Sequence, residues 1–199
     1  MDIYLIRHTR GKVDSNVCYG QTDIPLTDDF TETFKLIKNQ FPNLLTDFLV
    51  ITSPLQRCVQ LAKKLSASIT IDKRIMELNF GTWEMQKWDA INQMVLQEWM
   101  DDYVNIAPPS GESFQDLSKR CQDFWSDIIT SQTRQTIIVV THLGVIRALL
   151  ALVLEIPLQK SLCIQVDYGA INKLIYHTDI TTKQAWTTVE YLNKNRPSI

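Results

Sequence analysis

Two spacings of apolar residues alternate along the chain and predict a series of strands and helices. Short continuous apolar runs, such as residues 3–6 and 137–140, are typical of buried strands. Apolar residues that recur at helical spacing, as in residues 113–130, are typical of helices with one buried face. The predicted strands are 3–7, 47–52, 69–71, 137–140, 162–166, 173–177 and 187–191, and the predicted helices are 27–41, 54–65, 88–103, 113–130 and 144–155.

Strands and helices alternate along most of the chain, which is typical of α/β folds. The alternation predicts a three-layer α/β/α fold, with helices on both faces of a mostly parallel central sheet. A length of 199 residues suits one core, so we expect a single domain over residues 1–199. Ser53 is expected to cap the helix 54–65. Whether residues 103–111 move as a lid is left open.

Charge and composition exclude several classes of function. The net charge of −2 argues against a general nucleic-acid binder, which needs a basic surface. No apolar run reaches the roughly 18–20 residues of a membrane span, and no signal peptide is expected. The oligomeric state is left open. The cysteines form no CxxC pair, which predicts reduced thiols in the cytoplasm and no metal site; they are Cys18, Cys58, Cys121 and Cys163.

Basic side chains follow three of the predicted strands. Arg7 and His8 end the first strand, and His142 follows strand 137–140. Arg57 lies about one turn into the helix after the second strand. Because right-handed crossovers bring the carboxyl ends of parallel strands to one edge of a sheet, we expect these side chains to converge.

This convergence favours a site for a dianion such as phosphate. Arginine pairs two phosphate oxygens at once, and helices that begin at strand ends point N–H groups at the same place. A neutral histidine there is also a competent nucleophile. Taken singly, Arg57 suits a solvated helix and His142 a core histidine, so only their joint placement favours the site. His177 lacks such a placement and is expected to be structural.

Four short motifs follow one another within residues 3–147. They are Arg-His-Thr at 7–9, Ser-Pro-Leu-Gln-Arg at 53–57, Glu-Leu-Asn-Phe-Gly-Thr-Trp-Glu at 77–84 and His-Leu-Gly-Val-Ile-Arg at 142–147. In this order they resemble the histidine phosphatase superfamily, which includes the cofactor-dependent phosphoglycerate mutases. The resemblance implies a phosphoglycerate mutase-like fold and a phosphatase that needs neither metal nor cofactor.

The resemblance also implies roles for individual side chains. His8 matches the nucleophile that becomes phosphorylated, and Glu77 matches the proton donor to the leaving group. Arg7, Arg57 and His142 match the residues that bind the phosphate group. These residue types suit the chemistry, because in-line attack needs positive charge around the phosphate oxygens and the leaving alkoxide needs a proton.

The loop after His8 departs from the family pattern. Thr9 replaces a glycine, and Asp14 stands where the family often has an asparagine that contacts phosphate. We expect a rearranged loop in which Asn16 substitutes for that contact. Gln21 and Glu84 are further candidates for substrate binding.

Residues 18–26 and 77–85 are similar to the α-ribazole phosphatase branch of the family. This similarity implies hydrolysis of α-ribazole 5′-phosphate in assembly of the cobalamin lower ligand. The short chain leaves little room for the insertion of a mutase. Tryptophans in residues 83–103 are expected in the core, with stacking on a flat base as the alternative.

Two other functions remain open. One is a broad-specificity phosphatase or a phosphoglycerate mutase on the same scaffold. The other is a non-catalytic phosphate-binding module, which the presence of His8, His142, both arginines and Glu77 argues against. The expected partner in every case is a small phosphomonoester.

Overall fold

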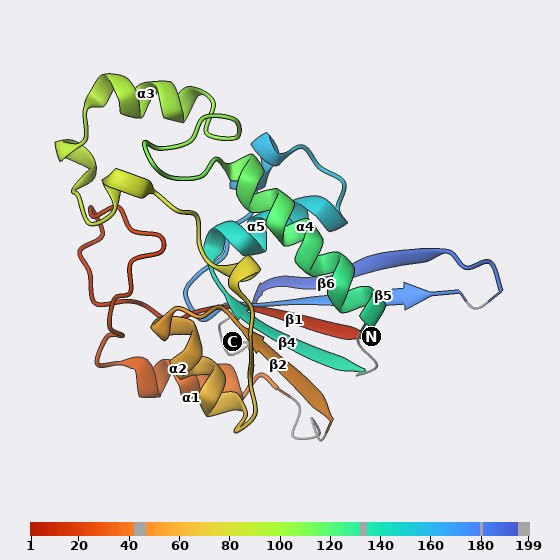
Figure 1. Cartoon of the computed structure of the whole chain (residues 1–199). Coiled ribbons are helices and arrows are strands. Elements are labelled where there is room, and N and C mark those ends of the chain that lie inside the picture. The colour runs from red at the N-terminus through yellow and green to blue at the C-terminus, as the bar shows by residue number, and fades with distance from the viewer. Residues whose placement is uncertain (42–46, 132–134, 180, 195–199) are drawn as a thin grey trace.

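A six-stranded sheet forms the middle layer of the fold (Figure 1). The structure is a computed structural model, and it describes residues 1–41, 47–131, 135–179 and 181–194. The strands are β1 (Asp2–Arg7), β2 (Phe48–Thr52), β3 (Thr70–Ile71), β4 (Thr136–Thr141), β5 (Ile171–Thr178) and β6 (Ala185–Lys194).

The strand order is β3-β2-β4-β1-β5-β6, with parallel pairing among the first four and antiparallel pairing of β5 and β6. The predicted mostly parallel sheet is therefore confirmed. The register pairs Arg7 with Thr141 and Thr52 with Val140. As a result, β1, β2 and β4 end side by side at one edge of the sheet.

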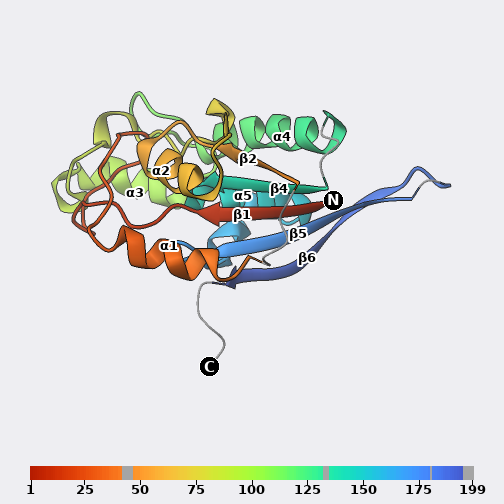
Figure 2. The ribbon, with the colours of Figure 1, turned by 90° about the horizontal axis from the view of Figure 1, so that it is seen from below.

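Helices cover both faces of the sheet (Figures 1 and 2). Ile3 and Leu5 of β1 belong to the core on the face of α4 and α5, whereas Tyr4 and Ile6 belong to the core on the face of α1 and α2. This alternation is the two-residue period of a strand. The helices are α1 (Phe30–Lys38), α2 (Gln56–Leu65), α3 (Gln93–Asp101), α4 (Phe114–Ser131) and α5 (Leu143–Val153), with short 3-10 helices η1 (Lys73–Ile75), η2 (Gly81–Trp83), η3 (Trp88–Ala90) and η4 (Leu158–Cys163).

Three predicted helices begin or end elsewhere. The helix predicted over 27–41 is confined to α1. The helix predicted over 88–103 is divided into η3 and α3, because Asn92 caps α3 with its side chain. The helix predicted to start after Ser53 begins only at Gln56, and its N-cap is Leu55. None of the helices in the described ranges is long and apolar enough to span a membrane.

The predicted strand 162–166 is wrong. The segment begins in η4 and continues without a sheet partner. Arginine side chains take up its carbonyl groups instead: Arg147 Nε donates to Ile164 at 3.0 Å, and Arg7 Nη1 donates to Val166 at 2.7 Å. The apolar run is therefore not part of the sheet, and Leu162 lines the cavity described below.

Candidate active site

Strand pairing sets His8, Ser53 and His142 side by side, one residue beyond the ends of β1, β2 and β4. The backbone N–H of His8 donates to Thr141 at 2.9 Å, and that of Ser53 donates to Val140 at 3.0 Å. These bonds continue the ladder of the sheet. The two imidazole rings lie 5.0 Å apart between centroids.

The imidazole of His8 is buried and held in one tautomer. Its Nδ1 lies 2.7 Å from the carbonyl oxygen of Thr9, which can only accept, so Nδ1 carries the proton. Nε2 then has a free electron pair, and Arg57 Nε donates to it at 3.3 Å. Burial, together with the charges of Arg57 and Arg7, holds the pKa of His8 well below its usual 6.5, although the bond to Thr9 opposes this. His8 is therefore a neutral imidazole, and its Nε2, which accepts the Arg57 hydrogen bond, carries the electron pair that a nucleophile needs.

Arg57 is fully buried, with 0% of its surface exposed. Besides its bond to His8, its guanidinium donates to the carbonyl oxygens of Gly20 and, at 3.0 Å, of Thr22. Arg57 forms no ion pair with a carboxylate of the described residues. A buried and unneutralised guanidinium favours a bound anion.

Arg7 supplies a second cation to the same place. Its guanidinium carbon lies 3.8 Å from the centre of the Tyr168 ring, and Nη1 donates to Val166. Its Nε is buried and has no hydrogen-bond partner in the described part of the chain. The donor is therefore positioned for an oxygen that the protein does not provide.

His142 is buried behind His8 and contacts Ser53. Its Nε2 lies 2.7 Å from the Ser53 hydroxyl oxygen and 3.4 Å from the Cys58 thiol. Burial, followed by the proximity of His8 and Arg57, holds the pKa of His142 well below 6.5. The sequence prediction missed this position of Ser53, because its expected role was a helix cap. Ser53 follows a strand end, as His8 and His142 do, and this shared placement is the signal that would have identified it as a site residue.

Glu77 lies at the start of α5, beside the Gly144 backbone. Both carboxylate oxygens are within hydrogen-bond distance of the Gly144 N–H, at 3.2 and 3.3 Å, and Leu78 N–H donates to one of them at 2.9 Å. A Cβ atom on Gly144 would lie 2.4 Å from Glu77 Oε1, so a larger residue there would displace the carboxylate. The start of α5 thus holds the carboxylate in place.

Arg120 braces the backbone that carries Glu77. Its guanidinium donates to the carbonyl oxygens of Arg74, Met76 and Glu77 at 2.6–3.0 Å, and it forms an ion pair with Glu112 at 2.5 Å. These contacts join α4 to the segment between η1 and η2. The sequence prediction did not identify either member of this pair as part of the site.

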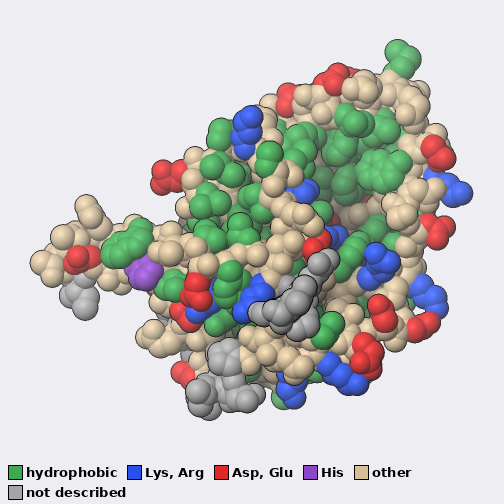
Figure 3. All heavy atoms as spheres, turned by 180° about the vertical axis from the view of Figure 1, so that it is seen from behind, with side chains coloured by type: hydrophobic (Ala, Val, Ile, Leu, Met, Phe, Trp, Pro, Cys, Tyr) green, Lys and Arg blue, Asp and Glu red, His purple; other side chains and the backbone are tan. Residues whose placement is uncertain are grey.

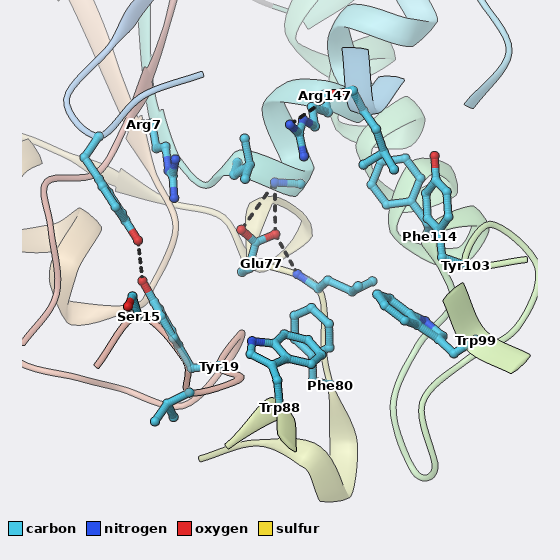
Figure 4. A pocket seen from close by; sticks show the side chains of 16 residues that line it. Arg7, Ser15, Tyr19, Glu77, Phe80, Trp88, Trp99, Tyr103, Phe114 and Arg147 are labelled. Carbon is cyan, nitrogen blue, oxygen red and sulfur yellow. Dashed lines mark hydrogen bonds between the residues drawn. The ribbon is translucent and has the colours of Figure 1, made fainter. Parts of the chain in front are cut away.

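An aromatic cavity of about 390 Å³ opens beside Arg7 and Glu77 (Figure 4). Seen from outside, the molecule is hollowed by a recess with largely hydrophobic walls (Figure 3). We use the name aromatic wall for Phe80, Trp88, Trp99, Tyr103 and Phe114, all of which line the cavity.

Asn16 and Asp14 lie outside the lining of this cavity. Asn16 accepts a hydrogen bond from the Trp88 backbone through its own carbonyl oxygen at 2.9 Å. Asp14 lines a separate hollow beside Tyr19. Gln21 is also outside the lining, and its side chain donates to the Glu77 carbonyl oxygen at 2.9 Å. The predicted phosphate contact of Asn16 stays a prediction.

Glu84 anchors the loop that holds Arg57. Its two carboxylate oxygens accept four backbone hydrogen bonds of 2.9–3.1 Å, three from residues 20–22 and one from Phe80. The carbonyl oxygens of the same loop accept from Arg57. Burial raises the pKa of Glu84, but the hydrogen bonds outweigh this effect and place the pKa below its usual value. Glu84 therefore positions the cation indirectly.

We expect Glu84→Gln to lower the free energy of unfolding by about 1–3 kcal/mol at pH 7, because an amide group turns two N–H atoms toward backbone donors. Because the pKa of Glu84 is lowered on folding, the wild-type carboxylate stabilises the fold at pH values above its usual pKa. This stabilisation is lost as the pH falls and the carboxylate is protonated. Urea unfolding should thus show the two proteins converging below about pH 4. The control is Glu98→Gln on exposed α3. If wild type and Glu84→Gln differed as much in unfolding free energy in acid as at pH 7, the charge of Glu84 would not be what holds the loop.

Comparisons with known proteins place the chain among phosphatases. An adenosylcobalamin/alpha-ribazole phosphatase of Escherichia coli is 27% identical, covering 97% of this chain and 96% of its own length. A putative phosphoserine phosphatase 2 of Hydrogenobacter thermophilus is 26% identical, covering 96% and 95%. The crystal structure of the alpha-ribazole phosphatase from Shigella flexneri superposes with a TM-score of 0.86 at 26% identity, covering 100% and 99%.

The family comparison agrees with the site geometry. The model of the histidine phosphatase superfamily (branch 1) matches residues 3–189, a range that contains every residue described in the site. Together with the structural match, it confirms the predicted phosphoglycerate mutase-like fold. The chain therefore belongs to branch 1 of the histidine phosphatase superfamily.

Proposed function

We propose that this protein is a phosphomonoesterase that transfers the phosphoryl group of its substrate to Nε2 of His8. The observation that carries the proposal is a neutral imidazole flanked by Arg57 and Arg7, neither of which donates to a carboxylate in the described ranges. Two guanidinium groups suit the two negative charges of a phosphate monoester. The imidazole between them suits attack on phosphorus.

The reaction has two steps. In the first, His8 Nε2 forms a bond to phosphorus while the bond to the ester oxygen breaks, and Glu77 gives its proton to that oxygen. Arg7, Arg57 and His142 stabilise the charge on the remaining phosphate oxygens. In the second, water attacks phosphorus, Glu77 takes up a proton from it, and the bond to His8 breaks to release phosphate. No metal or cofactor takes part in either step.

The substrate that we propose is α-ribazole 5′-phosphate, hydrolysed to α-ribazole and phosphate in assembly of the cobalamin lower ligand. Two observations support it. The relative from Escherichia coli is named an adenosylcobalamin/alpha-ribazole phosphatase, and that from Shigella flexneri an alpha-ribazole phosphatase. The aromatic wall suits a flat, apolar leaving group. The unpaired thiols of all four cysteines support a cytoplasmic location.

A substrate panel tests the proposal. We expect kcat/KM for α-ribazole 5′-phosphate to exceed that for phosphoserine and 3-phosphoglycerate by at least about tenfold, because only the first fills the aromatic cavity. The measurement is phosphate release under steady-state conditions. Equal values would favour a broad-specificity phosphatase, and transfer from a bisphosphoglycerate would favour a mutase. Absence of any turnover would favour the non-catalytic module.

A further inference from the structure

Trp88 is a member of the aromatic wall whose backbone and ring are both held in place. The backbone N–H of Trp88 donates to the carbonyl oxygen of Asn16 at 2.9 Å. The backbone carbonyl oxygen of Trp88 accepts from Gln93 Nε2 at 3.2 Å. The ring meets Phe80 edge to face at 5.8 Å and stacks on Trp99 at 6.4 Å with 24° between the planes. These contacts fix the direction of its indole N–H.

The indole N–H of Trp88 donates no hydrogen bond to any residue that the structure describes, and its nitrogen faces the open middle of the cavity, on the side of Glu77 (Figure 4). The indole N–H of Trp99 also has no partner among the described residues, but protein atoms cover its nitrogen completely, so a bound molecule cannot reach it. Tryptophan N–H groups in apolar surroundings usually have a partner. The donor of Trp88 is therefore placed to meet an acceptor on a bound molecule.

We propose that Trp88 determines specificity by donating an indole hydrogen bond to an acceptor atom on the leaving group. The inference rests on the proposed function and deepens it. In α-ribazole 5′-phosphate, the benzimidazole ring nitrogen that carries no substituent is such an acceptor. The flat base lies within the aromatic wall, with its ribose directed toward Glu77. A leaving group with a C–H in place of that nitrogen leaves the N–H unpaired and binds the transition state less well.

A cycle of two enzymes and two substrates tests the proposal. The substrates are α-ribazole 5′-phosphate and the matching dimethylindole riboside 5′-phosphate, in which carbon replaces the acceptor nitrogen. We expect wild-type kcat/KM to favour the benzimidazole by about tenfold. Trp88→Phe removes the N–H and should bring the two values within about twofold of each other. Incorporation of 3-benzothienylalanine at position 88, which keeps the ring shape but lacks the N–H, should do the same.

Trp186→Phe is the matched control, because Trp186 stacks on His177 in β6 outside the cavity lining and its loss should leave the substrate ratio unchanged. The proposal is overturned if both variants at Trp88 slow the two substrates by one common factor, since Trp88 is then only a wall. That result, with α-ribazole 5′-phosphate still preferred over phosphoserine, leaves the proposed function intact. A wild-type enzyme without that preference overturns both the substrate and the role of Trp88.

Discussion

His8→Ala lowers kcat by at least about 10⁴-fold with every phosphomonoester, because it removes the electron pair that attacks phosphorus. His142 does not replace it, since its Nε2 is engaged with Ser53 and its ring lies 5.0 Å behind that of His8. The measurement is phosphate release, together with quenched reactions on radiolabelled substrate. Wild-type protein should carry acid-labile phosphate, and the variant should carry none.

The third histidine provides the control for this experiment. His177 stacks on Trp186 at 5.0 Å in the hairpin of β5 and β6, so His177→Ala should keep kcat within about twofold. His8→Gln keeps an acceptor for Arg57 and should be equally inactive while remaining folded, as unfolding in urea would verify. Phosphohistidine that persists in either His8 variant would refute the assignment of the nucleophile.

The convergence of Arg7, His8, Arg57 and His142 was predictable, because it follows from chain topology alone. Parallel strands joined by right-handed crossovers end at one edge, and Arg7, His8 and His142 lie at or just after a strand end, whereas Arg57 lies in the first turn of the helix that follows one. The register then aligns them, with Arg7 opposite Thr141. Predicting that these residues converge therefore requires no knowledge of side-chain contacts.

The supports of the site were not predictable in the same way. Arg120 reaches carbonyl oxygens more than 40 residues away in sequence, and Arg147 takes those of the segment that was expected to be a strand. Hydrogen bonds from a side chain to backbone atoms far away in sequence leave no periodic pattern of residues in the sequence. Trp88 illustrates the same difficulty, since helical spacing could not distinguish a core tryptophan from one that lines a cavity. Irregular segments therefore contain the residues for which the structure was needed.

Glu77→Gln slows phosphoenzyme formation from α-ribazole 5′-phosphate by about 10²- to 10⁴-fold, because the alkoxide leaves without a proton. The glutamine oxygen still accepts from the Gly144 N–H, so the carbonyl-bearing side chain should stay in place. Phosphoenzyme formation from p-nitrophenyl phosphate should slow less than about tenfold, since nitrophenolate is a good leaving group. Single-turnover mixing measures both rates directly.

The second half of the reaction provides a separate check on Glu77. Water must lose a proton when it attacks the phosphoenzyme, so Glu77→Gln should slow this step equally for both substrates. With p-nitrophenyl phosphate, the variant should therefore release a burst of nitrophenol before a slow steady state. Glu98→Gln on exposed α3 should behave like wild type. Equal slowing of the first step with both leaving groups, and no burst, would mean that Glu77 orients the substrate without transferring a proton.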